Sequence, residues 1–68
     1  MKKPERIFLS NGTSADADRV VAVSLSEDTF RVFLKGEAGV TLCSVRHETL
    51  EDALEEIKKV NQQMGWGN

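Results

Sequence analysis

The chain has 68 residues, of which 40% are hydrophobic and 29% are charged, and its formal net charge is −2. A chain of this length forms one domain at most, near the lower size at which chains fold without disulfides or metals. The apolar content excludes a disordered chain, and the negative balance argues against a general phosphate-binding surface, which needs an excess of Lys and Arg.

Cysteine content and hydropathy indicate the compartment. Cys43 is the one cysteine, which excludes an internal disulfide and favours a reducing interior, because extracellular domains this small usually depend on several bridges. No segment approaches the ~18 apolar residues that span a bilayer, and the apolar run at 7–9 is too short for a signal peptide. We therefore expect a soluble cytoplasmic protein with no membrane partner.

The first 18 residues form the least regular part of the sequence. Residues 6–10 can add a fourth strand at an edge of the sheet. Residues 11–18 are polar with small side chains and indicate a flexible loop, within which Asn11-Gly12 is typical of a turn. We expect residues 1–68 to form a single domain, with 1–18 as an edge strand plus a loop or as a mobile connection.

Three strands are predicted next, at 19–26, 29–35 and 40–46, because apolar and β-branched residues alternate there with polar ones. A two-residue turn at 27–28 and a glycine turn at 36–39 join them. If Ser26 faces Thr29 and Gly36 faces Gly39, one face carries Val21, Val23, Leu25, Phe30, Val32, Leu34, Cys43 and Val45. A one-residue slip in the second hairpin would exchange Cys43 and Val45 for Leu42 and Val40, so the register of 40–46 stays open.

A single amphipathic helix is predicted at 49–64, with Thr49 as its N-cap and Gly65 as its left-handed end. Its apolar stripe comprises Leu50, Ala53, Leu54, Ile57, Val60 and Met64. We expect the acidic residues of its first half, Glu56 among them, to lie on the solvated face. The predicted fold is therefore α+β: an antiparallel three- or four-stranded β-meander with one C-terminal helix packed on one face.

The second face of the sheet is the candidate binding surface. In the register above it carries more apolar side chains than a solvated face should, and contiguous exposed patches of this kind usually mark interfaces. The candidate residues are Phe33, Val20, Ala22, Val40, Leu42, Arg31 and Lys35. The alternatives are that Ile7 and Leu9 fold back over this face, or that the register differs.

These features favour a small non-enzymatic interaction or regulatory module that binds a protein partner, or a second copy of itself as a homodimer, through the second sheet face. The alternative is a nucleic-acid-binding domain that uses the same face, with Arg31 and Lys35 contacting phosphates and Phe33 stacking on a base. The negative net charge and the presence of a single aromatic residue on that face disfavour this alternative.

No catalytic, metal or cofactor site is predicted, and no small-molecule substrate. Cys43 and His47 would lie about 13 Å apart on one strand at ~3.3 Å per residue, too far for a nucleophile and its base. Asp16 and Asp18 match the start of a calcium loop, but apolar valines stand where further oxygen ligands and the glycine belong. We therefore expect a protein that is not an enzyme.

Overall fold

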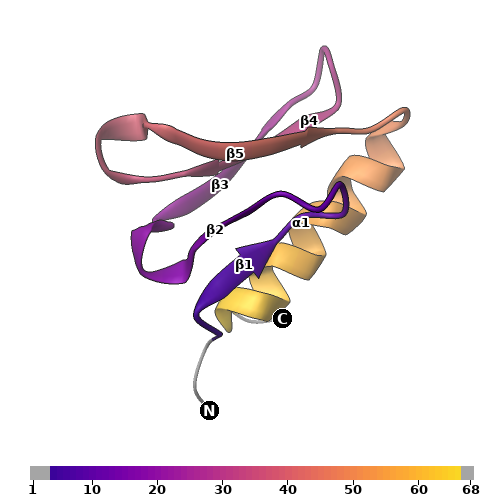
Figure 1. Ribbon diagram of the computed structural model, residues 1–68. Helices are drawn as coiled ribbons and strands as arrows, with labels where there is room; N and C mark the ends of the chain where they lie inside the picture. Colours follow the sequence, from indigo (N-terminus) through magenta and orange to yellow (C-terminus); the bar gives the residue numbers. More distant parts are fainter. Residues whose placement is uncertain (1–3, 67–68) are drawn as a thin grey trace.

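The computed structural model describes residues 4–66 and contains two antiparallel sheets and one helix (Figure 1). The predicted α+β fold is confirmed. In chain order the elements are β1 (Arg6–Phe8), β2 (Ser14–Asp16), a 3-10 turn (Ala17–Arg19), β3 (Ala22–Ser26), β4 (Arg31–Lys35), a second 3-10 turn (Glu37–Gly39), β5 (Thr41–Arg46) and α1 (Leu50–Met64).

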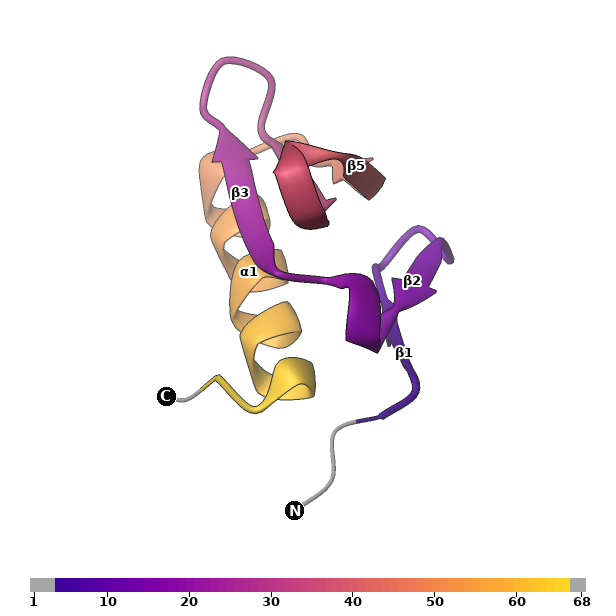
Figure 2. The same ribbon diagram turned by 90° about the vertical axis from the view of Figure 1, so that its left-hand side faces the viewer.

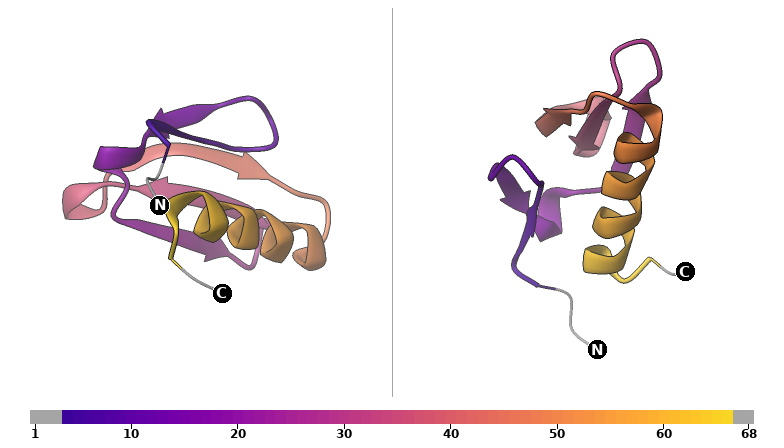
Figure 3. Two further views of the ribbon diagram at one scale, coloured as in Figure 1. Left: turned by 90° about the horizontal axis from the view of Figure 1, so that it is seen from below. Right: turned by 90° about the vertical axis from the view of Figure 1, so that its right-hand side faces the viewer.

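The elements are arranged in two layers. The meander, in the order β3-β4-β5, forms one layer, and α1 lies beside the β1–β2 hairpin in the other. In the view of Figure 2, α1 runs behind β3 and extends below it, and the hairpin lies below β5. The two views of Figure 3 show the same arrangement from below and from the opposite end. A single helix is too narrow to cover three strands, so the hairpin completes the second layer.

The amino-terminal segment was expected to form an edge strand plus a loop, and the structure differs from this expectation. Residues 1–3 of that segment lie outside the described residues. Residues 6–8 do form a strand, but β1 pairs with β2 in a sheet of its own and not with the meander. The Asn11-Gly12 turn is confirmed, because Gly12 has φ +89° and its N–H donates to the carbonyl of Leu9 at 3.0 Å. Asn11 Oδ1 also accepts the Thr13 N–H at 3.2 Å, which stabilises the turn.

Both registers of the meander are displaced by two residues from those predicted. Val32 pairs with Leu25 and with Val45, and Leu34 pairs with Val23 and with Cys43. Because side chains alternate with a period of two, a two-residue displacement leaves the regularly paired residues Val23, Leu25, Val32, Leu34, Cys43 and Val45 on their predicted face. The displacement arises from wider turns: Phe30 takes the positive φ of +56° that the first turn needs, and a β-bulge interrupts the second hairpin beside Lys35.

The core lies between the two layers and draws on every strand and the helix. Val32 and Leu34 of the central strand are fully buried, and Ile7 of the hairpin is equally inaccessible. The buried hydrophobic residues are Ile7, Leu9, Ala15, Ala17, Val20, Val32, Leu34, Val45, Ala53, Val60 and Met64. Ile7 and Leu9 thus pack beneath the sheet on the helix side and do not cover the second sheet face.

Helix α1 begins and ends at the predicted signals. Thr49 Oγ1 accepts the N–H of Asp52 at 3.1 Å, and Gly65 takes φ +74° while the Trp66 N–H donates to the carbonyl of Asn61 at 2.9 Å. The second bond is that of a Schellman motif, which satisfies a carbonyl at the helix end. No helix among residues 4–66 has the length and apolar content needed to cross a membrane.

Candidate functional site

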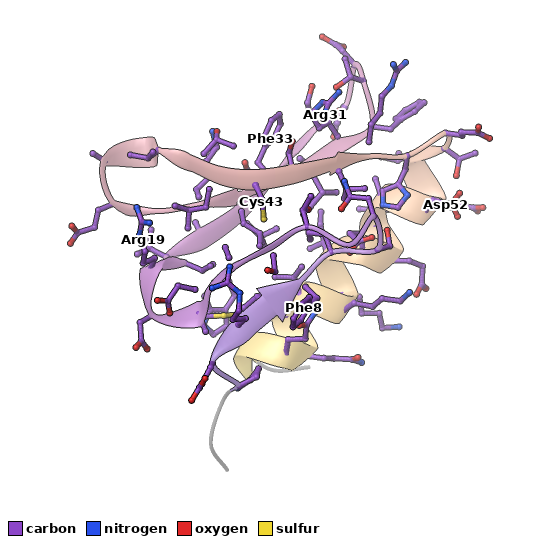
Figure 4. All side chains as sticks on the ribbon, viewed as in Figure 1. Phe8, Arg19, Arg31, Phe33, Cys43 and Asp52 are labelled. Carbon is purple, nitrogen blue, oxygen red and sulfur yellow. The ribbon has the colours of Figure 1, made fainter. Side chains whose placement is uncertain are left out.

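The face of the meander turned away from α1 is the candidate site, and we call it the outer sheet face. Val32 and Leu34 of β4 are buried toward the helix, so the alternate residues of that strand point outward. Figure 4 shows Phe33 and Arg31 on this outward side, with Cys43 directed toward the hairpin. The outer sheet face comprises Ala22, Ser24, Ser26, Arg31, Phe33, Lys35, Thr41, Ser44 and Arg46.

Phe33 lies at the centre of this face and is half-buried, between Ser24 on one neighbouring strand and Ser44 on the other. Lys35 Nζ lies 4.9 Å from the centroid of its ring, a cation–π contact that orients the ammonium group over the aromatic face. Lys35 Nζ also donates to Thr41 Oγ1 at 2.8 Å. These contacts hold an aromatic ring and a cation together at the middle of the sheet.

The outer sheet face is positively charged, although the chain as a whole is acidic. Arg31 and Arg46 occupy directly opposed positions on β4 and β5, an arrangement of like charges that destabilises a strand pair. Arg31 donates to the hydroxyl of Ser44 at 3.3 Å. Among residues 4–66 the one side-chain contact with salt-bridge geometry joins His47 to Glu56, so no carboxylate of the described chain lies within 4.0 Å of either guanidinium.

Three of the predicted binding residues lie elsewhere. Val20 was placed on the outer face, but it is buried in the core, because the 3-10 turn at Ala17–Arg19 interrupts the strand alternation before it. Leu42 is the extra residue of the β-bulge and packs against the core. Val40 lies in the turn that follows β4 and is 53% exposed. The structure therefore brings together Phe33, Arg31, Lys35 and Ala22 only.

Val40 instead borders a shallow hollow of about 550 Å³ between the two 3-10 turns. Val21 and Leu42 also line it, with the charged residues Asp18, Arg19 and Glu37 around the rim. These charged residues are exposed, and within the described chain no buried side-chain polar atom lacks a hydrogen-bond partner. The charged groups at the rim of the hollow are therefore solvated.

Glu56 was expected on the solvated helix face, and that expectation was wrong. Its side chain is 2% exposed. One carboxylate oxygen lies 3.0 Å from His47 Nε2, and the other accepts the backbone N–H of Ser10 at 3.2 Å. The hairpin packs on this flank of α1 and removes the carboxylate from water. A signal was present in the sequence, because Glu56 follows the buried Ala53 by three residues and precedes the buried Val60 by four.

The Cys43 thiol and the His47 imidazole do not form a pair, because His47 is bound to Glu56. Partial burial raises the pKa of the Cys43 thiol, while a hydrogen bond with Thr13 and the charge of Arg6 act in the opposite direction. A raised pKa keeps the thiol protonated, and the protonated form is a poor nucleophile. Within residues 4–66 no three His, Cys, Asp or Glu side chains cluster closely enough to hold a metal ion.

Comparisons of this chain with protein-family models, with curated proteins and with solved structures found no match. The outer sheet face is therefore interpreted from its own geometry and charge.

Proposed function

We propose that the chain is a non-enzymatic binding module whose outer sheet face docks an acidic surface of a protein partner. The observation that supports this most directly is the opposed pair Arg31 and Arg46, which has no carboxylate partner among the described residues. A carboxylate placed between the two guanidinium groups relieves their repulsion and accepts hydrogen bonds from both. The free protein thus holds two adjacent guanidinium groups that an anionic ligand can bind.

Phe33 supplies the apolar centre of this interface. Protein interfaces combine a desolvated aromatic or Arg anchor with a polar rim, and truncating a central aromatic residue commonly costs ~2 kcal/mol or more of binding free energy. Phe33 is half-buried between small serines, so part of the ring stays accessible beside the Lys35 ammonium group. The surrounding Arg31, Lys35 and Arg46 orient an acidic partner around it.

A face-to-face homodimer through the outer sheet face is disfavoured by the same charges. Two-fold pairing places a patch against its own copy, so the three cations of one molecule would meet those of the other. The outer sheet face carries Arg31, Lys35 and Arg46 and no acidic residue. We therefore propose a partner other than a second copy for this face, and a cytoplasmic location on the basis of the single cysteine.

Single-stranded nucleic acid is the second candidate, and the contact between Phe33 and Lys35 favours it. Sheet-based modules stack bases on aromatic residues and place cations along the backbone. Three phosphate contacts would give a salt slope of about −2 for a single strand. Such binding would be weak on its own, because typical binders neutralise more phosphates, and we therefore rank a protein partner first.

Charge reversal on matched surfaces tests this proposal. The double variant Arg31→Glu/Arg46→Glu and the control Arg19→Glu/Lys59→Glu change the net charge equally, but the control alters exposed residues away from the outer sheet face. Tagged wild type and both variants are used for affinity capture from the native host, with nuclease and protease treatment of the captured material. We expect the control to retain the partner and the double variant to lose it, with circular dichroism confirming that both are folded.

Capture of the same material by all three proteins would contradict the proposal. Loss of the captured material on nuclease treatment would favour the second candidate. In that case, titration of the purified chain with a single-stranded oligonucleotide at several salt concentrations should return the slope of about −2 given above.

A further inference from the structure

The two edges of the three-stranded sheet differ in what covers them: the hairpin contacts the β5 edge and leaves the β3 edge open. At the β5 edge, the amide of Asn11 donates to the carbonyl of Ser44 at 3.2 Å, and β2 packs alongside. The β3 edge receives nothing comparable, because the hairpin lies under β5 and away from β3 (Figure 2). Folded proteins usually cover or charge a free strand edge, since it is a template for pairing with another chain.

The hydrogen-bond alternation identifies the backbone groups that point out of the β3 edge. In an antiparallel ladder, successive residues direct their N–H and C=O groups to one neighbouring strand and then to the other. The His47 N–H donates to the carbonyl of Phe30 at 2.9 Å, so the even-numbered residues of β4 bond to β5 and the odd-numbered ones bond to β3. The residues of β3 that pair with these odd-numbered residues of β4 are Ala22, Ser24 and Ser26.

Val23 and Leu25 therefore direct their backbone groups away from β4, into the open edge. No turn, loop or side-chain hydrogen bond formed by residues 4–66 reaches the backbone of either residue. Both side chains are only partly buried against the core. The edge thus offers two donors and two acceptors above a partly exposed apolar strip.

Helix α1 extends this apolar strip below the strand. Glu56 and Gln63 contact the hairpin at Ser10 and Phe8, which fixes the flank of α1 that faces away from β3. Leu54 is two residues from Glu56 and so lies about 200° around the helix, on the β3 side. Leu54 is 50% exposed and Leu50 is 41% exposed, although both belong to the predicted apolar stripe.

We propose that this edge pairs with the β3 edge of a second copy of the chain, which joins two meanders into one six-stranded antiparallel sheet. The strand is self-complementary about Ser24. With Ser24 facing its own copy, Val23 of each molecule faces Leu25 of the other, which pairs apolar with apolar on the helix side. The same register uses all four outward backbone groups of each molecule.

The charges of α1 fit the same two-fold arrangement. The axis is perpendicular to the sheet, so the two helices run antiparallel beside each other. On the side of α1 that carries Leu54, the first half of the helix presents Glu51 and the second half presents Lys58, whereas Lys59 lies about 140° around the helix from Leu54. Because α1 runs back along β3 (Figure 3), the acidic half of each helix faces the basic half of the other. Residues Glu51 and Lys58 border the exposed Leu54, so they flank the apolar contact.

Substitution of Ser24 tests the register through charge. Non-hydrogen-bonded cross-strand neighbours have Cβ atoms about 4.5–5.5 Å apart, so Ser24→Lys places two ammonium groups together at the axis and Ser24→Glu places two carboxylates there. Ser44→Lys is the matched control, because Ser44 also neighbours Phe33 on the outer sheet face but lies on the opposite edge. The mass of each protein is followed by sedimentation equilibrium over a range of concentrations.

We expect the wild type to pass from 7.6 kDa to twice that mass with a dissociation constant of about 1–100 μM, because the strand and helix flank are small for an interface. Each Ser24 variant should dimerise at least tenfold more weakly, an equimolar mixture of the two should recover the dimer, and Ser44→Lys should resemble the wild type. A wild type that stays monomeric at millimolar concentration overturns the proposal. The proposal is also overturned if Ser44→Lys dimerises as weakly as Ser24→Lys. The same holds if the equimolar mixture of Ser24→Lys and Ser24→Glu does not recover the dimer.

A covalent test is independent of charge. Ser24→Cys should form a disulfide-linked dimer under mild oxidation, since the Cα separation of about 4.5 Å at a non-hydrogen-bonded pair lies within the ~4.4–6.8 Å that disulfides span. Ser44→Cys retains the same native Cys43 and should remain unlinked. Equal cross-linking of both variants would refute pairing at β3.

Discussion

The buried Glu56 carboxylate yields the sharpest test of the structure. Glu56→Gln preserves the shape of the side chain but removes its charge. The carboxylate accepts one hydrogen bond from His47 and one from the Ser10 N–H. A hydrogen bond to a charged group contributes ~1.5–3 kcal/mol, and a neutral one ~0.5–1.5 kcal/mol. Loss of charge at two bonds therefore costs about 2 kcal/mol, and somewhat more if the amide NH₂ faces a donor.

This cost is large for so small a domain. At roughly 0.05–0.15 kcal/mol per residue, the free energy of unfolding is about 3–10 kcal/mol. With a urea m-value of about 1 kcal/mol/M, Glu56→Gln should lower the unfolding midpoint by about 2 M, measured by far-UV circular dichroism. The neighbouring Glu55 is exposed, and Glu55→Gln is the control, with an expected change within about 0.5 kcal/mol.

A double-mutant cycle isolates the contact with the imidazole. His47→Ala alone leaves one oxygen of Glu56 without its donor and should cost ~1–3 kcal/mol. In the Glu56→Gln background the same substitution should cost about 1 kcal/mol less, because the charge-assisted bond is already lost. If Glu56→Gln and Glu55→Gln unfold at the same urea concentration, Glu56 is not the desolvated, hydrogen-bonded group that the structure shows.

Three further outcomes are expected. Burial raises the pKa of the Cys43 thiol above its ordinary 9.0, so at alkaline pH the folded state keeps a proton that the unfolded chain loses. The contribution of this thiol to stability is therefore full below pH 9.0 and is lost as the pH rises through the folded pKa. Urea titrations at several pH values should show this loss in the wild type and a smaller one in Cys43→Ala. Val32→Ala, at a fully buried site, should lower the free energy of unfolding by about 2 kcal/mol, whereas Val40→Ala, at a 53% exposed site, should lower it by under ~0.5 kcal/mol. Equal urea midpoints for the two variants would contradict the placement of the core. Thr49→Ala removes the cap that binds the Asp52 N–H and should lower stability by about 1 kcal/mol, with helical content near 222 nm as the readout.

The meander and the helix were predictable because their signals are local and repeated. Alternation assigns side chains to faces whatever the exact pairing, so a register displaced by two residues still left Phe33 outside and Val32 inside. The displacement itself was not predictable from alternation. It depends on turn conformation: two-residue hairpin turns favour Gly and Asn, which Glu27-Asp28 lacks, and the chain instead uses a wider turn with Phe30 at positive φ.

The site was predicted only in part, because its errors lie where regular alternation ends. Val20 follows a 3-10 turn and Leu42 forms a bulge, and each is rotated into the core by its local irregularity. Without these two side chains the outer sheet face is far less apolar than expected, and its cations become its main feature. The pairing of Arg31 with Arg46 could have been found only with the correct register, since the predicted one placed Arg46 opposite Thr29 and Arg31 opposite Ser44.

The β1–β2 hairpin explains most of what the sequence left open. Its strands are three residues long, too short to give a periodic signal, yet its position decides three features of the molecule. By packing beside α1 it buries Glu56 and turns Leu54 toward the β3 side. By packing under β5 it occupies that edge of the sheet through Asn11. What remains open is the β3 edge and a basic outer sheet face, so the proposed contact surfaces follow from where residues 4–16 fold.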